Sequence, residues 1–417
     1  MESPNNNEEK SKYSTRRSEL LPLWIGLFVD VLGFYIIIPF LPSFIHLFHT
    51  TPFVIGLVLA TNAVFTLFFA PIWGKISDKF GRKPILIICQ CGTFTGFIIL
   101  IFANSVEMLF LARMVDGMFG GIYPIVKAIV SDTMPPKERG SQMTNLGVVH
   151  TLAGLIGPGL GGFLSLFYIL GPGYPIATAS LAAALLALTA LITSLIFVNE
   201  SWPKEKRIKT QEKIKIHILK NKDATWLLTL YMFHTIAFTM YTTTLTIYLG
   251  IVMGLDTLGI SILLTISGIS RAIVRFTVFK PTLKWLGEGK STIIGLLILV
   301  VTFFLIGFVK DIITFVVLIV VISYGVSCSR GLLMSKITLT VSPKEMGKIN
   351  GYTTTLDSIA QILGPIIGTL ILTVLNEIWW GAFMSLLSLV AFFMIFKKII
   401  PYHLKEQGAE SIFPNIN

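Results

Sequence analysis

The sequence predicts an all-α integral membrane protein, in which twelve transmembrane helices form two pseudo-symmetric six-helix bundles around a central cavity. Three observations support this prediction: the composition, the apolar segments, and a repeat between the two halves of the chain. Of the 417 residues, 53% are hydrophobic and only 13% are charged, and the mean hydropathy is +0.78. A water-soluble protein carries about 25% charged residues, so this chain is expected to lie in a lipid bilayer.

Twelve apolar segments approach the ~20 residues that an α-helix needs to cross the hydrocarbon core. These segments are residues 20–46, 53–73, 85–103, 107–131, 141–170, 174–198, 224–250, 256–279, 291–309, 312–336, 346–374 and 377–396. The predicted parts of the chain are a disordered cytoplasmic tail at 1–19, an N-terminal bundle at 20–198, a basic cytoplasmic linker at 199–223, a C-terminal bundle at 224–397 and a cytoplasmic tail at 398–417.

Lysine and arginine fall almost entirely on one side of the predicted membrane. They cluster in both tails, in the linker and in alternate loops, whereas the opposite side holds only Lys310. Because cytoplasmic loops carry the excess of Lys and Arg, both termini are expected to be cytoplasmic in a multi-pass protein of the cell membrane. The net charge of +11 then reflects topology, and no nucleic-acid partner is expected.

The two halves repeat each other at a constant separation of 207 residues. The sequence Pro-Lys-Glu-Arg-Gly at 136–140 returns as Pro-Lys-Glu-Met-Gly at 343–347, and Gly-Pro at 157–158 returns at 364–365. An ungapped match over this distance indicates a duplication. Two parallel repeats of six helices place a binding site between them, near the middle of the membrane.

Ionisable residues inside the apolar segments identify candidate functional positions. Such a residue costs about 2.5–3.5 kcal/mol at mid-membrane on insertion scales, so it is expected to face a partner or a watery cavity. Asp30 lies about ten residues into the first segment, ~15 Å deep, and is the first candidate for a proton carrier. Arg113 and Asp116 are three residues apart and can pair with each other, which is a structural alternative to a role in proton coupling.

Further polar residues are expected to line the central cavity and to contact a substrate. His150 and Asp357 are equivalent under the 207-residue separation, and Arg271 and Arg275 share a helical face. The predicted cavity residues are His150, His234, Tyr241, Arg271, Arg275, Arg330 and Asp357.

Residues 74–84 read Gly-Lys-Ile-Ser-Asp-Lys-Phe-Gly-Arg-Lys-Pro and are predicted to form a charged loop between two spans. Gly74 would let two helices approach closely, Asp78 and Arg82 are spaced to pair, and Gly81 can adopt a positive φ. This pattern resembles the loop motif of the major facilitator superfamily, whose members are secondary transporters.

The first half also carries motifs that are similar to those of the twelve-span drug:proton antiporters, the group of the tetracycline and multidrug exporters. Leu32-Gly33 followed by Pro39 resembles the first-helix motif, and Arg113-x-x-x-Gly117 resembles the fourth-helix motif, whose arginine is associated with proton coupling. The fifth-helix motif that is typical of exporters matches Gly157, Pro158, Gly161 and Gly162. Here the glycines permit close helix contact and the proline bends the helix.

The resemblance implies a gate on the cytoplasmic side. In this family the charges equivalent to Asp78, Arg82 and Asp132 form a network that latches this side closed. The expected gate residues are Gly74, Asp78, Gly81, Arg82, Asp132 and Arg139.

The resemblance implies proton-coupled export of amphipathic small molecules by alternating access. An alternative is the transport of a defined metabolite, such as an organic anion, by symport or uniport, because cations outnumber carboxylates inside the spans. An enzyme is not expected, since the sequence lacks His-Glu-x-x-His and Gly-x-Ser-x-Gly. No cofactor or metal is expected either, because all three cysteines lie in apolar segments, and the chain is expected to be a monomer.

Overall fold

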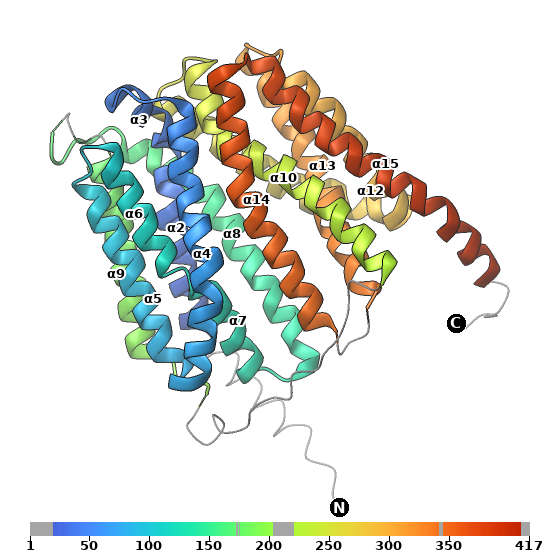
Figure 1. The fold of residues 1–417 in the computed structure, drawn as a ribbon, viewed down its shortest axis with the longest axis horizontal. Coiled ribbons are helices and arrows are strands. Elements are labelled where there is room, and N and C mark those ends of the chain that lie inside the picture. Colours follow the sequence, from blue (N-terminus) through green and yellow to red (C-terminus); the bar gives the residue numbers. More distant parts are fainter. Residues whose placement is uncertain (1–19, 172–173, 175, 203–220, 342–344, 410–417) are drawn as a thin grey trace, which may run out of the picture. The chain divides into compact units, whose positions relative to one another are not determined.

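The computed structural model describes residues 20–171, 174, 176–202, 221–341 and 345–409, and these residues form helices joined by short turns (Figure 1). No strand occurs in these ranges. The predicted tail at 1–19, most of the predicted linker and the end of the C-terminal tail lie outside the described residues. The contacts divide the chain into two compact units, Met1–Lys213 with Leu249–Gly268, and Ile214–Tyr248 with Ile269–Asn417.

The first unit is built around α2, which packs along both α8 and α9. Its helices are α2 (Leu21–Ile37), η1 (Ile38–Phe40), α3 (Leu41–Leu47), α4 (Pro52–Phe80), α5 (Arg82–Ile101), α6 (Val106–Met118), α7 (Ile122–Thr133), α8 (Pro136–Leu164) and α9 (Ala177–Phe197). It also contains the larger part of α11 (Thr257–Val274).

In the second unit α12 packs between α13 and α15. Its helices are α10 (Lys222–Ile251), the π-helical η4 (Arg275–Phe279), α12 (Lys280–Ile306), α13 (Ile312–Leu339), α14 (Met346–Val374) and α15 (Glu377–Ala409). The π-helix continues α11 directly into α12.

The helices coincide with the twelve predicted apolar segments, but the number of membrane-spanning helices that hydropathy identifies among the described residues is 10. One of these, Thr257–Ile306, is 50 residues long and covers two predicted segments. The predicted segment 224–250 lies on α10, whose many threonines lower its hydropathy. The predicted segment 141–170 ends six residues beyond Leu164, where α8 ends, and begins after Pro136, where α8 starts. The count of twelve spans stays a prediction.

Residues 74–84 do not form the predicted loop. The α4 helix continues to Phe80, and α5 begins at Arg82, so Gly81 alone connects them. Gly81 has φ 110°, as expected for a glycine at a sharp reversal. Gly287, at nearly the equivalent position of the second half, also has a positive φ of 71°.

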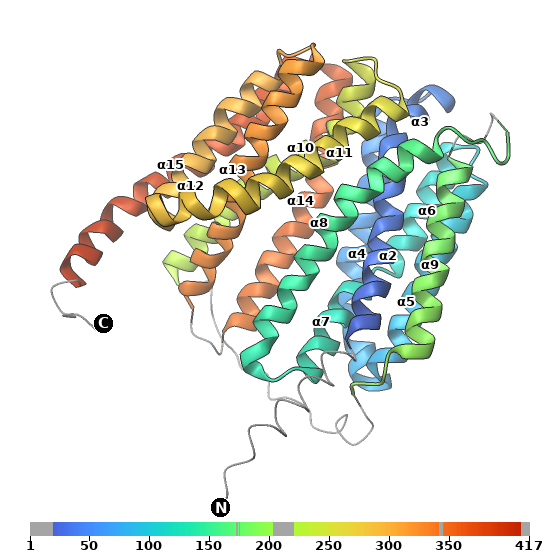
Figure 2. The same cartoon turned by 180° about the vertical axis from the view of Figure 1, so that it is seen from behind.

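Figure 2 shows α8 running beside α2. Two glycines of the predicted helix-bend motif, Gly157 and Gly161, lie at this contact. A Cβ atom added at Gly157 would overlap the Tyr35 side chain, and one at Gly161 would overlap the Ile36 carbonyl oxygen. Gly162 faces Ser261 of α11 in the same way. In the second unit Gly364 lies 2.8 Å, measured from its added Cβ, from the Met240 backbone nitrogen. Each unit therefore depends on small residues for one close helix crossing.

We expect Gly161→Ala to destabilise the protein by about 1–3 kcal/mol, because the new methyl group meets a backbone carbonyl that cannot move aside easily. The apparent melting temperature of the purified protein in detergent measures this. Gly147→Ala is the matched control, since it lies on the same helix and its added Cβ meets no atom within 4 Å. Equal melting temperatures for the two variants would contradict the close crossing.

Candidate functional site

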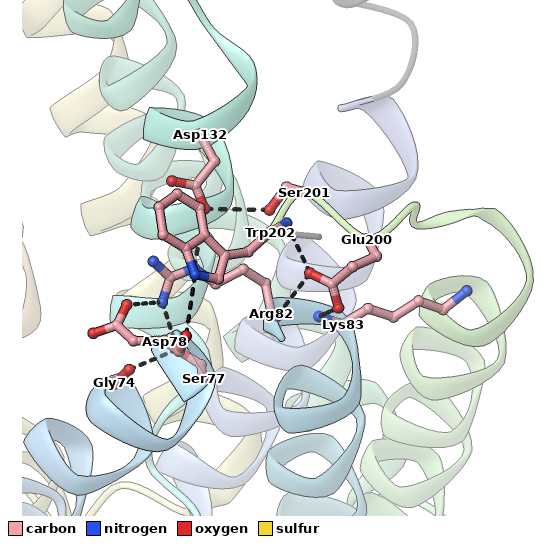
Figure 3. Close-up of polar contacts among 9 residues, drawn as sticks. All are labelled: Gly74, Ser77, Asp78, Arg82, Lys83, Asp132, Glu200, Ser201 and Trp202. Carbon is pink, nitrogen blue, oxygen red and sulfur yellow. Dashed lines mark hydrogen bonds and ion pairs between the residues drawn. The ribbon is translucent and has the colours of Figure 1, made fainter. Parts of the chain in front are cut away.

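A polar cluster surrounds Arg82 at the junction of α4 and α5 (Figure 3). Although Arg82 is charged, it is only 7% exposed. Its Nη1 lies 2.7 Å from Asp78 Oδ1, and its Nε lies 3.0 Å from Asp132 Oδ2 on α7. The same Nη1 donates to Ser77 Oγ at 2.7 Å. A buried arginine thus joins three helices, and two carboxylates contact its guanidinium.

The segment that follows α9 closes this cluster from another side. Glu200 accepts hydrogen bonds from the backbone nitrogens of Arg82 at 2.8 Å and Lys83 at 3.3 Å, so its carboxylate caps the first turn of α5. The Trp202 ring lies 5.4 Å from the Arg82 guanidinium, and its Nε1 donates to the Asp78 carbonyl at 3.1 Å. Ser201 Oγ reaches Asp132 Oδ2 at 3.4 Å.

The structure thus brings together Asp78, Gly81, Arg82 and Asp132 of the predicted gate. Gly74 lies nearby, but a Cβ added there would meet no atom within 4 Å, so the expected close approach has no support. Arg139 does not join the cluster, because its Nε donates to the Met134 carbonyl at 2.9 Å. The sequence analysis missed Ser77, Glu200, Ser201 and Trp202. Of these residues only Ser77 lies near Arg82 in the sequence.

A second polar cluster lies inside the first unit. Arg113 is 6% exposed, and its Nη1 lies 3.4 Å from Asp116 Oδ2, as the three-residue spacing predicts. Asn62 Nδ2 on α4 donates to the same oxygen at 2.8 Å, and the Thr93 hydroxyl of α5 also hydrogen-bonds the Asp116 carboxylate. Asp30 on α2 lies within electrostatic range of Asp116.

Two atoms of this cluster have no hydrogen-bond partner among the described residues, namely Asp30 Oδ1 and Arg113 Nη2, and both are buried. Arg113 also lies at one wall of a narrow pocket whose other walls are apolar. That pocket is lined by Phe34, Ile37, Ile38, Leu41, Phe44, Val58, Leu59, Leu100, Leu109 and Arg113. The cluster therefore combines two carboxylates, one guanidinium and unused bonding capacity in an apolar interior.

His150 on α8 lies in an aromatic setting in the same unit. Its ring centroid is 5.3 Å from that of Tyr123 and 6.5 Å from that of Tyr35. Lys127 Nζ lies 5.1 Å from the Tyr123 ring. An aromatic ring of this kind attracts a cation, and Lys127 of the chain itself supplies one here.

The second unit has its own charged cluster, in which three of the predicted cavity residues lie. Asp357 Oδ1 on α14 lies 3.3 Å from Arg330 Nη2 on α13 and accepts a 3.0 Å hydrogen bond from the Tyr231 hydroxyl on α10. The Arg330 guanidinium lies 5.3 Å from the Phe238 ring. His234 is fully buried behind them, with Nε2 3.4 Å from Ser329 Oγ.

The other three predicted cavity residues do not belong to this cluster. Tyr241 is 2% exposed and its ring lies against Phe303, which places it in the helix core, and its role in a cavity stays a prediction. Arg275 is exposed on the π-helix. Arg271 Nε is buried and makes no hydrogen bond to a residue that the structure describes.

The family model of the Major Facilitator Superfamily matches residues 23–364. The chain belongs to this superfamily. Multidrug resistance protein 2 of Bacillus subtilis is 25% identical over 370 residues, which cover 86% of this chain and 90% of that protein. The class H tetracycline resistance protein of Pasteurella multocida is 24% identical over 378 residues, covering 88% of this chain and 92% of that protein.

Solved structures of other membrane transporters share the fold. The human organic anion transporter MFSD10 superposes with a TM-score of 0.69 at 21% identity, over 91% of this chain and 99% of that one. A bacterial homologue of the lysosomal transporter Spinster gives a TM-score of 0.71 at 15% identity, over 91% of this chain and 96% of that one. This member of the superfamily is therefore a multi-pass membrane transporter of small molecules.

The sequence repeat of this transporter is also a repeat of contacts. Tyr123 and Arg330 are separated by 207 residues, as are His150 and Asp357. Tyr123 contacts His150 in the first unit, and Arg330 contacts Asp357 in the second. Equivalent positions therefore meet in both units, but one pair is aromatic and the other is ionic. Among the residues that the structure describes, no group of three or more potential metal ligands occurs.

We expect Glu200→Gln to lower the stability of the transporter by ~1 kcal/mol, the usual contribution of a helix cap. The amide retains one oxygen but presents an NH2 group to a backbone N–H that now donates to the carboxylate. The apparent melting temperature in detergent measures the loss. The exposed Glu288→Gln is the control, and a matching, negligible shift in both variants would show that Glu200 does not hold the junction together.

Proposed function

We propose that this transporter exports amphipathic small molecules in exchange for protons by alternating access. Relatives matched over most of their length are named as multidrug, tetracycline and quinolone resistance proteins. The observation that carries the proton-coupled part of the proposal is the cluster of Asp30, Arg113 and Asp116 in the interior of the first unit. We further propose a monomer in the cell membrane with both termini in the cytoplasm, in line with the distribution of lysine and arginine.

The charge count of the cluster suggests how a proton is used. One guanidinium can balance one carboxylate, and Arg113 already pairs with Asp116. Asp30 is then the carboxylate without a compensating charge, and its Oδ1 has no partner among the described residues. Protonation of Asp30 neutralises the cluster, and loss of that proton restores a buried charge, which disfavours a closed apolar environment. Asp30 is therefore the proposed proton carrier, with Arg113 and Asp116 as its electrostatic partners.

The cluster around Arg82 is proposed to act as the latch of the cytoplasmic side. Asp78 is the accessible member, since its side chain is 61% exposed while that of Arg82 is 9% exposed. An exposed carboxylate that is held in place by a buried arginine can bind a second positive group and still remain oriented. In the proposed cycle Asp78 makes and breaks such a contact, while Arg82, Asp132 and Glu200 keep the helix ends together.

A second candidate function is the transport of a defined organic anion. Arg271, whose Nε is buried without a hydrogen-bond partner in the described chain, and the exposed Arg275 favour this alternative, because both can bind carboxylate or phosphate groups.

We expect Asp30→Asn to abolish dye transport that is driven by a pH gradient, because the amide cannot exchange a proton. The measurement is the movement of a fluorescent cationic dye in proteoliposomes with an imposed pH gradient. Asp311→Asn, at the N-terminal cap of α13, is the control and should transport normally. Full transport by Asp30→Asn would move the proton elsewhere, whereas acidification coupled to an added organic anion, with no dye movement, would favour the second candidate function.

Asp78→Asn is expected to abolish transport while the protein still inserts into the membrane, because the amide keeps the shape but loses the charge of the latch. Transport in proteoliposomes and the amount of folded protein after purification are measured together. Lys75→Gln, one turn earlier on α4, controls for a general change of surface charge. Full transport by Asp78→Asn would contradict the latch.

A further inference from the structure

The ion pair between Arg330 and Asp357 is exposed enough for a ligand to displace either residue from its partner. The Arg330 side chain is 42% exposed and that of Asp357 is 28% exposed. Their contact of 3.3 Å is longer than the 2.7–2.9 Å that is typical of a strong charge-assisted hydrogen bond. A partly exposed pair with such geometry contributes little to stability. Separating the two groups therefore costs the folded protein little.

Each member of the pair has a second contact that does not depend on the other. The Phe238 ring lies 5.3 Å from the Arg330 guanidinium, and the Tyr231 hydroxyl donates to Asp357 Oδ1 at 3.0 Å. Tyr231 and Phe238 are seven residues apart on α10, so they lie on one face of that helix. When the pair opens, Phe238 still supports the cation and Tyr231 still orients the carboxylate.

A buried histidine lies behind these two residues. His234 lies between them on the same helix, is fully buried, and contacts Ser329 Oγ at 3.4 Å. Its ring stacks on Phe238 with a centroid distance of 6.5 Å and an interplanar angle of 14°. A ligand that separates Arg330 from Asp357 therefore meets a preformed surface, which lowers the entropic cost of binding.

We propose that this pair selects zwitterionic substrates, with the substrate carboxylate bound by Arg330 and the substrate cation bound by Asp357. The inference rests on the proposed export function for the transport step, but the binding step stands on the geometry of the second unit alone. A zwitterion replaces one internal ion pair by two ion pairs and leaves no charge without a partner. A simple cation takes Asp357 away from Arg330, and a simple anion takes Arg330 away from Asp357. Each of these ligands gives up the internal ion pair and gains only one new ion pair, whereas a zwitterion gains two, so both bind less well than a zwitterion.

Two rhodamine dyes provide a matched test, because they share one aromatic body. Rhodamine 110 is a zwitterion with a free carboxylate, and rhodamine 123 is its methyl ester and carries only the positive charge. Binding of each dye to the purified full-length protein in detergent is measured by fluorescence anisotropy, without any proton gradient. Wild-type protein is compared with Arg330→Gln, Asp357→Asn, the charge swap R330D/D357R, and Lys336→Gln, which removes another cation of α13.

Arg330→Gln is expected to weaken rhodamine 110 by about tenfold or more, the usual loss when one charge-assisted contact is removed. The same variant should bind rhodamine 123 at least as well as the wild type does, because Asp357 is released from its partner. Asp357→Asn should weaken both dyes, the charge swap should restore rhodamine 110, and Lys336→Gln should change neither.

Equal effects of Arg330→Gln on the two dyes would overturn the inference, and so would wild-type protein that binds only rhodamine 123. A misfolded variant is recognised by loss of its single size-exclusion peak, and the charge swap then decides, because it keeps both charges. Selective binding of rhodamine 110 without gradient-driven transport would support this inference and contradict the proposed export function. Wild-type protein that binds neither dye would contradict both this inference and the proposed export function.

Discussion

A charge inside an apolar bundle is stable only beside a partner, and this constraint organises the polar side chains of the structure. Three arginines show it, two of them buried and one partly exposed. The side chains of Arg82 and Arg113 are 9% and 8% exposed, and each is paired with carboxylate oxygen. Arg330 is 42% exposed and lies 3.3 Å from Asp357, so its contact with a carboxylate is open to solvent. The cost of an unpaired charge falls with exposure, so the buried contact of Arg82 with Asp132 is suited to holding helices together. The exposed pair of Arg330 with Asp357 is suited to exchange.

Close helix crossings are the second condition on which these pairs depend. Gly157 and Gly161 bring α8 against α2, the helix that carries Asp30. Gly364 does the same for α14 against α10, the two helices that carry Asp357 and Tyr231. In both units the polar residues thus lie on helices whose spacing is set by the absence of a side chain. A larger residue at these crossings would displace the charged groups as well as the helices.

The sequence alone was sufficient to predict the general fold and the contacts within one helix. Composition and apolar segments predicted a helical membrane protein, the three-residue spacing predicted the contact of Arg113 with Asp116, and glycine predicted the positive φ at position 81. Contacts between segments that are distant in the sequence were harder to predict. Glu200 lies 118 residues from Arg82, and nothing in its local sequence indicates a helix cap. The resemblance to known transporters supplied Asp132, which spacing alone would not have found.

The differences between the expected and the observed surroundings of individual residues also have physical causes. Tyr241 was placed in the cavity because its helix is rich in threonine and tyrosine, but a tyrosine ring can equally well pack on Phe303 in the core. Arg271 and Arg275 were grouped with Arg330 by charge alone, and a π-helix begins at Arg275, which changes the register of the following residues. The loop at 74–84 was predicted from charge and glycine content, although both are compatible with helix ends.

The single-residue junction at Gly81 makes the length of this part of the chain more critical than its composition. Successive residues of an α-helix are rotated by about 100° around its axis. One inserted residue would therefore turn the start of α5 away from Asp132 and Glu200, even if every side chain of the cluster were kept. Substitutions around Arg82 that preserve the charge balance are therefore compatible with this junction. Insertions or deletions between α4 and α5 are not.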